Sequence, residues 1–392
     1  MKYKRIYQKF NKSTLLLGPR GTGKSTYIES EIKPDLILNL LKSSTFKILL
    51  KDPSELENMI QHLKSGSIVF IDEVQKIPEL LDEVHRLIES KKIHFVLTGS
   101  SARKLKKSGV NLMAGRAINK KFYPLTLKEI GSEKSIESII FSGLLPSAVN
   151  LKSKDDVNDY LFSYVDLYLK EEIFQEGLSR NLSQFSEFIE IAGQYNGQII
   201  NYENIAKSIG VSGDTIKSWF KVLQDTLLGD YTEAYHLNLM KKETRHPKFY
   251  FFDHGISRAA EGLRTLESVS EKNGFYLENI ILNELKVYRE VNKKDFKIFF
   301  YNVPGIGDID FVIETRRKTL SKPAEFILLN VKYSKNWNTQ FNKLSNLILE
   351  KFEKNCLRSI GIYRGDQRLT YEKNEIYPIN DFVKLIWSGK LF

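Results

Sequence analysis

"LLLGPRGTGKST", residues 15–26, joins an apolar run to a glycine-rich turn that ends on a lysine and two hydroxyl side chains. Its spacing fits G-x-x-x-x-G-K-[ST], with Gly18, Gly23, Lys24 and Ser25 at the fixed positions. Glycines let backbone N–H groups surround a phosphate, and the N-terminus of a following helix favours negative charge. The stretch therefore predicts a buried strand, a phosphate-binding loop and a helix, in that order.

A second stretch, "SIVFIDE" at residues 67–73, predicts a buried parallel strand that ends in two carboxylates. We expect Asp72 to hold Mg²⁺ together with Ser25, and Glu73 to polarise the attacking water. Lys24 is expected to contact the β- and γ-phosphates of ATP. The nucleotide-binding residues predicted beside Asp72 are Gly18, Pro19, Arg20, Gly21, Thr22, Gly23, Lys24, Ser25 and Thr26.

Strand and helix patterns alternate through the first third of the chain. Strand patterns at residues 35–41 and 94–101 flank an amphipathic helix pattern at 78–90. This order predicts an α/β fold with a doubly wound parallel sheet, whose strand C-termini face the nucleotide. Ser100 or Thr98, at the polar tip of the later strand, is our candidate for sensing the γ-phosphate; an ordinary strand-ending turn is the alternative.

Composition limits the classes of protein that this sequence fits. The chain has 59 Lys and Arg against 48 Asp and Glu, a net charge of +11, with the basic excess in residues 1–130 and 266–392. DNA is therefore one candidate partner and a protein is another. Cys356 is the only cysteine, which excludes an intrachain disulfide. The sequence shows neither a signal peptide nor a membrane span, so we expect a cytoplasmic protein without a membrane partner.

The segments "GPRGTGKS", "VFIDEVQKIPELLDEVHRLIE", "LTGSSARKLKKSGVNLMAGRA" and "FYPLTLKEI" resemble the prokaryotic AAA-type (AAA+) ATPases that carry a C-terminal domain of unknown function. The resemblance implies a P-loop NTPase that uses ATP and Mg²⁺. It also implies a role for Arg116 as an arginine finger or sensor, acting on its own nucleotide or on a neighbour's. A solvated arginine in a basic loop is the alternative. A homo-oligomer is implied by the family alone.

The middle region, residues 151–265, is predicted to hold helices and a winged helix. Residues 205–223 have a helix-turn-helix pattern, and 232–239 and 248–253 are expected to form the strands of the wing. Residues 197–229 contain three lysines and three acids, so a packing role competes with DNA binding. The residues chosen for testing DNA contact are Lys217, Lys221, Lys241, Lys242 and Arg245.

Residues 266–392 are predicted to form a helix followed by three strands, and their order and spacing resemble the PD-(D/E)XK nuclease-like fold. In that resemblance Asp310 and Lys332 match metal-site positions, but Asn330 replaces the expected glutamate. Glu278 and Glu284 are the helix acids considered as substitutes. A buried Asp310–Lys332 ion pair is the alternative to metal catalysis, and we expect a vestigial, catalytically silent site.

These features predict three domains: an ATPase domain at 1–150, a helical and winged-helix region at 151–265, and a nuclease-like α/β domain at 266–392. The expected function is Mg²⁺-dependent ATP hydrolysis that drives or times a conformational change, acting with nucleic acid. The alternatives are a nucleotide-switched protein-binding module with slow hydrolysis and an ATP-regulated, metal-dependent DNA nuclease.

Overall fold

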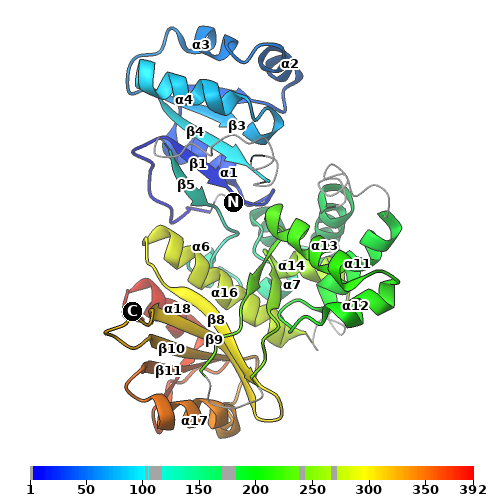
Figure 1. Cartoon of the computed structure of the whole chain (residues 1–392), viewed down its shortest axis with the longest axis vertical. Coiled ribbons are helices and arrows are strands. Elements are labelled where there is room, and N and C mark those ends of the chain that lie inside the picture. The colour runs from blue at the N-terminus through cyan, green and yellow to red at the C-terminus, as the bar shows by residue number, and fades with distance from the viewer. Residues whose placement is uncertain (1–2, 102–104, 106–116, 170–181, 238–242, 266–271) are drawn as a thin grey trace. The chain divides into compact units, whose positions relative to one another are not determined.

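A computed structural model describes residues 3–101, 105, 117–169, 182–237, 243–265 and 272–392, which form two compact units (Figure 1). The first unit is Met1–Leu125 with Leu145–Ser147 and Lys221–Leu228. The second is Thr126–Leu144, Ala148–Phe220 and Gly229–Phe392. The expected division into three domains, with boundaries near residues 150 and 265, stays a prediction.

The first unit is built on a five-stranded sheet in the order β2-β3-β4-β1-β5, in which all neighbouring strands run parallel. The strands are β1 (Thr14–Leu17), β2 (Leu36–Asn39), β3 (Ile68–Asp72), β4 (His94–Gly99) and β5 (Ile118–Lys121). The helices are α1 (Lys24–Tyr27), which continues as a π-helix over Ile28–Ile32, α2 (Ser43–Lys51), α3 (Glu55–Ile60), a 3-10 turn at Val74–Lys76, and α4 (Leu80–Lys91). The predicted mixed α/β fold with a parallel sheet is confirmed.

The sheet of the first unit is apolar on its inner strands because helices and loops cover it. Val69, Ile71 and Leu97 are fully buried, as continuous apolar runs in parallel strands require. Helix α4 adds Leu80 and Leu87 to the same core, at the helical spacing that the sequence predicted. The order of the strands places the end of β4 between the loops that follow β1 and β3.

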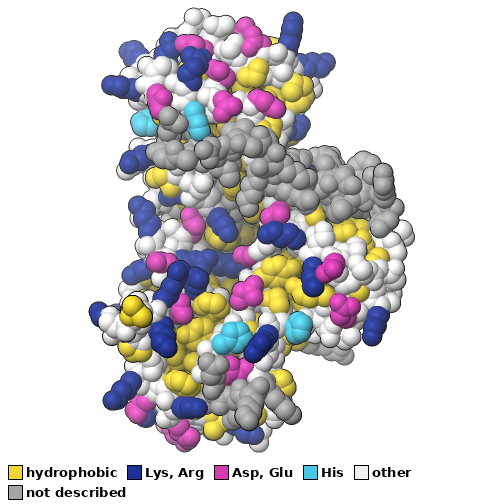
Figure 2. Space-filling model, in the orientation of Figure 1, with side chains coloured by type: hydrophobic (Ala, Val, Ile, Leu, Met, Phe, Trp, Pro, Cys, Tyr) yellow, Lys and Arg dark blue, Asp and Glu magenta, His cyan; other side chains and the backbone are white. Residues whose placement is uncertain are grey.

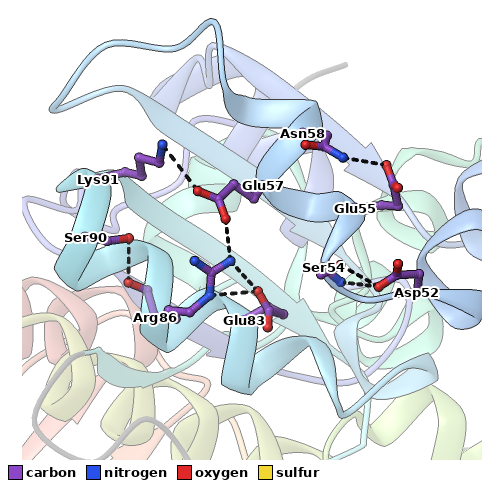
Figure 3. A network of polar contacts seen from close by, with 9 residues as sticks. All are labelled: Asp52, Ser54, Glu55, Glu57, Asn58, Glu83, Arg86, Ser90 and Lys91. Carbon is purple, nitrogen blue, oxygen red and sulfur yellow. Dashed lines mark hydrogen bonds and ion pairs between the residues drawn. The ribbon is translucent and has the colours of Figure 1, made fainter.

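A network of surface charges joins α3 to α4 (Figure 3). The Arg86 guanidinium contacts the carboxylates of Glu57 at 2.7 Å and Glu83 at 2.8 Å, and Lys91 Nζ lies 3.3 Å from Glu57 Oε1. These ion pairs lower the pKa of Glu57, with the Arg86 hydrogen bond as the largest cause. Because the Arg86 side chain is 45% exposed, solvent screens the pairs and they add little stability.

A helical region follows the first sheet, and it belongs to the second unit except for the residues in Leu145–Ser147 and Lys221–Leu228. Its elements are α6 (Leu127–Ile130), a 3-10 turn (Gly131–Glu133), α7 (Ile136–Ser142), α8 (Pro146–Asn150), α9 (Lys154–Ser163) with a π-helix (Tyr164–Leu169), α11 (Leu182–Gln194), α12 (Tyr202–Ile209), α13 (Gly213–Asp225), β6 (Gly229–Thr232), β7 (Lys248–Phe251) and α14 (His254–Ala260). Among the described residues, none of the helices is both long enough and apolar enough to cross a membrane.

Helices α12 and α13 lie where the sequence predicted two helices joined by a turn, and the winged helix stays a prediction. Gly210 ends α12 with a left-handed φ of 77°, and Ser212 Oγ accepts a hydrogen bond from the N–H of Thr215 at 3.1 Å to start α13. The strand expected at 232–239 is wrong. The strand that pairs antiparallel with β7 is β6, which ends at Thr232. The residues after β6 pair instead with β8: the Tyr235 N–H donates to Phe300 O at 2.7 Å.

The C-terminal part forms a six-stranded sheet in the order β12-β13-β11-β10-β9-β8. Its elements are α16 (Asn273–Val291), β8 (Lys297–Val303), β9 (Gly307–Arg316), β10 (Glu325–Lys332), a 3-10 turn (Thr339–Asn342), α17 (Lys343–Phe352), β11 (Cys356–Tyr363), β12 (Leu369–Tyr371), β13 (Asn374–Pro378) and α18 (Ile379–Trp387). β8, β9 and β10 are antiparallel neighbours, whereas β10, β11 and β13 run parallel. The expected helix and three strands are therefore present.

A buried carboxyl group of α16 holds the start of α6. Glu284 accepts hydrogen bonds from the backbone N–H of Leu127 and, at 2.8 Å, from Trp387 Nε1. Burial raises the pKa of Glu284 to about 7, although these donors oppose the shift. Glu284 thus has a structural partner set in the fold and does not join the acids of β9.

Candidate functional site

The glycine-rich loop between β1 and α1 approaches neighbouring backbone closely. A Cβ on Gly18 would lie 2.2 Å from the carbonyl oxygen of Phe122, so only glycine fits there. Gly21 and Gly23 have left-handed φ angles of 77° and 89°, which L-residues rarely adopt. The three glycines are therefore required by the path of the loop.

Lys24 closes this loop. Its ammonium group donates to the carbonyl oxygens of Gly18 at 2.7 Å and Pro19 at 2.8 Å, and Thr22 Oγ1 donates to the same Pro19 oxygen at 2.9 Å. The Lys24 residue is 6% exposed. One positive charge is thus held inside the loop where an anion would lie. Arg20, Ser25 and Thr26 complete the predicted loop and are partly or fully exposed.

The hydroxyl and the first carboxylate predicted for the metal lie together. Ser25 Oγ donates to Asp72 Oδ2 at 3.0 Å, although the two residues are 47 positions apart in sequence. Thr98 Oγ1 donates to the other oxygen of Asp72, Oδ1, at 2.5 Å. The strand that carries Thr98 lies next to β3, which explains how Thr98 orients the Asp72 carboxylate.

The second carboxylate, Glu73, is held by different partners. Its Oε2 atom accepts hydrogen bonds from Ser100 Oγ at 3.1 Å and from Gln75 Nε2. Gln75 Nε2 also contacts Ser100 Oγ at 2.9 Å. Glu73 has a left-handed φ of 61°, an uncommon conformation for a residue other than glycine. The two sensor candidates therefore contact different carboxylates: Thr98 contacts that of Asp72, and Ser100 contacts that of Glu73. Thr98 Oγ1 also accepts a hydrogen bond from the backbone N–H of Glu73 at 3.3 Å.

Two residues near this site were not found from the sequence. Gln75 bridges Glu73 and Ser100. Arg5 donates to the carbonyl oxygens of Thr22 at 2.7 Å and Tyr123 at 2.8 Å, and its guanidinium lies 4.2 Å from the centre of the Phe122 ring. No local sequence pattern marks either residue, because their partners lie far away along the chain or depend on a turn.

Several predicted residues lie outside the described part of the chain. They are Arg116, most of the basic segment at 102–116, and Lys241 and Lys242 of the expected wing tip. Their roles stay predictions. Lys217 and Lys221 are described: Lys217 pairs with Asp214 at 3.1 Å and Lys221 with Asp225 at 3.5 Å on the surface of α13.

A second group of charged residues lies in the C-terminal part of the chain. Asp310 Oδ2 accepts hydrogen bonds from the backbone N–H of Val331 at 2.6 Å and from Lys332 Nζ at 3.2 Å. Glu278 Oε2 accepts from Tyr250 OH at 3.0 Å. Glu278 also interacts through charge with Asp310 and Lys332, so the three side chains belong to one cluster. That this cluster is a vestigial nuclease site stays a prediction.

In this group, burial and the nearby lysines shift the pKa values of the carboxyl groups in opposite directions. Burial raises the pKa of Glu278 to about 7, with the Lys248 ammonium opposing it. Burial by itself would also raise the pKa of Asp310, but Lys332 and Lys248 outweigh it and lower that pKa. Asp310 is therefore the carboxylate that the two lysines keep ionised.

Comparison with known families divides the chain into three consecutive segments. Residues 10–131 match a model described as an AAA domain. Residues 133–267 and 273–382 match two models, each described as a domain of unknown function (DUF8612 and DUF4143). The first match covers the glycine-rich loop and all five strands of the first sheet, and it supports an AAA-type ATPase domain.

The chain also resembles individual proteins at low identity. An uncharacterized protein of Mycobacterium tuberculosis is 22% identical over 306 residues, which are 76% of this chain and 67% of that protein. An uncharacterized protein of Methanocaldococcus jannaschii is 25% identical over 423 residues, 95% of this chain and 84% of that protein. Neither resemblance is close enough to transfer a function.

Among solved structures, the Aeropyrum pernix ORC1 protein in complex with DNA shares 10% identity at a TM-score of 0.25, covering 64% of this chain and 86% of that chain. A DNA replication initiation factor shares 15% identity at a TM-score of 0.25, covering 52% of this chain and 66% of that chain. These scores are too low to transfer a fold or a ligand.

Proposed function

We propose that this chain binds ATP with Mg²⁺ and hydrolyses it to drive or time a conformational change. The observation that carries the proposal is the contact of Ser25 Oγ with Asp72 Oδ2 at 3.0 Å, beside a loop closed by Lys24. A hydroxyl and a carboxylate oxygen are ligands that Mg²⁺ prefers. Bound there, the ion would supply charge neutralisation to the β- and γ-phosphates.

The residues of the chain have separate roles in this proposal. The backbone amides of residues 18–26 surround the phosphates, and the Lys24 ammonium exchanges its contacts with Gly18 and Pro19 for phosphate oxygens. Ser25 and Asp72 hold the metal. Glu73 accepts the proton of the attacking water. Ser100 positions Glu73, and Arg116 contacts the γ-phosphate of its own or of a neighbouring nucleotide in a homo-oligomer.

One observation favours a second candidate, a nucleotide-switched binding protein with slow hydrolysis. The Glu73 carboxylate already accepts hydrogen bonds from Ser100 and Gln75. An attacking water has to compete with these two donors for the Oε2 atom of Glu73. Hydrolysis therefore requires these hydrogen bonds to loosen, which would make the basal rate slow and let a partner control it.

The class of partner follows from charge. The net charge of +11 supports a polyanion such as DNA. On the face that Figure 2 shows, however, basic side chains are interspersed with acidic ones. A protein partner is therefore the competing choice, and the winged helix is a candidate contact for either.

ATP hydrolysis measured with and without single-stranded and duplex DNA tests the proposal. We expect slow, Mg²⁺-dependent hydrolysis that DNA accelerates, with an acceleration that falls steeply as salt rises. Hydrolysis that DNA does not change would favour the protein-directed switch. A particle mass measured in ATP shows whether the chain assembles. Absence of Mg²⁺-dependent hydrolysis under all these conditions would contradict the enzyme assignment.

Arg5 is expected to position the phosphate-binding loop. Its guanidinium fixes the Thr22 carbonyl within the loop and the Tyr123 carbonyl after β5, and Lys cannot make both contacts with the same planar geometry. Arg5→Lys should therefore raise the KM for ATP about tenfold, the loss of a charged hydrogen bond, while kcat changes little. Steady-state kinetics with a thermal unfolding control would check this; an unchanged KM in the folded variant would contradict it.

The C-terminal part is proposed to be a nuclease-like domain that does not cut DNA. Asn330, which stands where the resemblance expects a glutamate, donates from Nδ2 to Ser345 Oγ at 3.0 Å. Glu325, the nearest acid on the same strand, contacts Arg316 at 2.6 Å. The charged group around Asp310 therefore favours structural ion pairing over metal catalysis.

A further inference from the structure

The charged group of the C-terminal part is a compact, mostly buried cluster formed within the second unit. Three carboxyl groups come from α16 and β9: Glu278, Asp308 and Asp310. Two ammonium groups come from β10 and β7: Lys332 and Lys248. Glu278, Asp310 and Lys332 were named from the sequence, whereas Lys248 comes from the β6–β7 hairpin, which belongs to a different sheet.

Lys248 reaches the acids from a fixed strand. Its Nζ atom lies 3.5 Å from Glu278 Oε2, 4.0 Å from Asp308 Oδ2 and 5.3 Å from the centre of the Phe300 ring. The residue is 4% exposed. Its backbone pairs with Thr232 of β6, so the strand holds the side chain in place. Lys248 thus supplies a desolvated positive charge directly to two carboxylates.

The same geometry does not fit a divalent cation. Such an ion needs several oxygen atoms that converge on one point. Asp310 Oδ2 accepts from the N–H of Val331 and from Lys332, and Asn330 Nδ2 donates to Ser345. Among the described residues the Oδ1 atoms of Asp310 and Asn330 have no hydrogen-bond partner, and two such atoms do not make the coordination sphere of a divalent ion. Within the described ranges, no group of three His, Cys, Asp or Glu side chains is arranged to hold a metal.

We propose that Lys248 is a built-in cation that takes the place of a divalent metal between Glu278 and Asp308, next to Asp310. An ion bound from solution can leave, but a lysine side chain cannot. The cluster is thereby closed to metal-dependent chemistry, and its ion pairs tie the β6–β7 hairpin to α16 and β9. This inference goes beyond ATP hydrolysis and does not depend on it.

Titration of the full-length protein with Mn²⁺ in the absence of nucleotide tests the proposal, with bound ion measured by electron paramagnetic resonance. Lys248→Ala should bind Mn²⁺ about tenfold or more tightly than the wild type, because it leaves buried carboxylates without their counter-charge. Adding Asp310→Asn to that variant should remove the gain. Asp310→Asn alone should leave the Mn²⁺ binding of the wild type unchanged. This comparison distinguishes Mn²⁺ bound at the cluster from Mn²⁺ bound near the loop around Lys24.

Lys286→Ala is the matched control, since it removes another mostly buried lysine, which pairs with Asp230 at 3.6 Å. It should bind Mn²⁺ like the wild type. Circular dichroism checks that each variant folds, and Lys248→Gln, which keeps a hydrogen-bond donor, serves where Lys248→Ala does not fold. The proposal is overturned if a folded Lys248 variant gains no Mn²⁺ affinity, or if wild-type Mn²⁺ binding is lost with Asp310→Asn.

Discussion

Glu73→Gln should lower the rate of ATP hydrolysis by about 10² to 10⁴-fold, the usual contribution of a positioned proton acceptor. Glutamine has the size of glutamate and can still contact Ser100, but it cannot take a proton from water. ATP binding should persist, because Lys24, Ser25 and Asp72 keep their contacts. Single-turnover kinetics, with nucleotide affinity measured in parallel, would check both parts.

The matched control is Glu57→Gln, which removes an acid from the surface network of the same unit (Figure 3). Its hydrolysis rate should equal that of the wild type. If Glu73→Gln hydrolyses ATP at the wild-type rate, Glu73 is not the proton acceptor. ATP binding would remain a sound assignment in that case, since it depends on other side chains.

Lys24→Ala should weaken ATP binding by about 100-fold or more. The ammonium group makes two hydrogen bonds to loop carbonyls, at 2.7 and 2.8 Å. When ATP binds, it would donate these hydrogen bonds to phosphate oxygens instead. Hydrogen bonds to charged groups contribute about 1.5–3 kcal/mol each, and 1.4 kcal/mol is tenfold in affinity. The loop also loses the cross-link that holds its shape. Competition against a fluorescent nucleotide would measure the change.

Lys91→Ala, on the surface of α4, is the control for a lysine lost from the same unit. It should leave nucleotide affinity unchanged. If a folded Lys24→Ala protein binds ATP with wild-type affinity, Lys24 does not contact the phosphates. Lys91→Ala should be about as stable as the wild type. Thermal unfolding of Lys24→Ala would separate a loss of stability from a binding defect.

The parallel sheet and the glycine-rich loop could be predicted because their signals are local. A short apolar run such as residues 68–71 suits a strand that is covered on both faces, and left-handed positions such as Gly23 accept few other residues. Strand C-termini in a parallel sheet share one edge, which is why Ser25 and Asp72 were expected near each other. The match to an AAA domain supports this part of the prediction.

What could not be predicted depends on contacts between distant segments. Arg5 contacts carbonyls that lie 17 and 118 residues away in sequence, and nothing in its neighbours specifies those partners. The contact of Gln75 with Ser100 depends on the turn after β3, which the sequence around Gln75 does not specify. Lys248 was assigned to a wing strand, because the sequence does not show that β7 brings it against Glu278.

The wing strand was misplaced for a similar reason. Residues 232–239 have an apolar and aromatic pattern that suits any strand, so the pattern did not specify the pairing partner. In the structure β6 ends at Thr232, and Tyr235 pairs with Phe300 of β8. Competition between two neighbouring sheets for one segment is a tertiary effect, and strand propensity does not resolve it.

Calorimetric titration of the wild-type protein with ATP in magnesium buffer tests the central claim most directly. The account predicts saturable binding at one site per chain, which weakens when magnesium is removed and is strongly reduced in Lys24→Ala. No heat of binding for ATP, or binding that Lys24→Ala leaves intact, would contradict it.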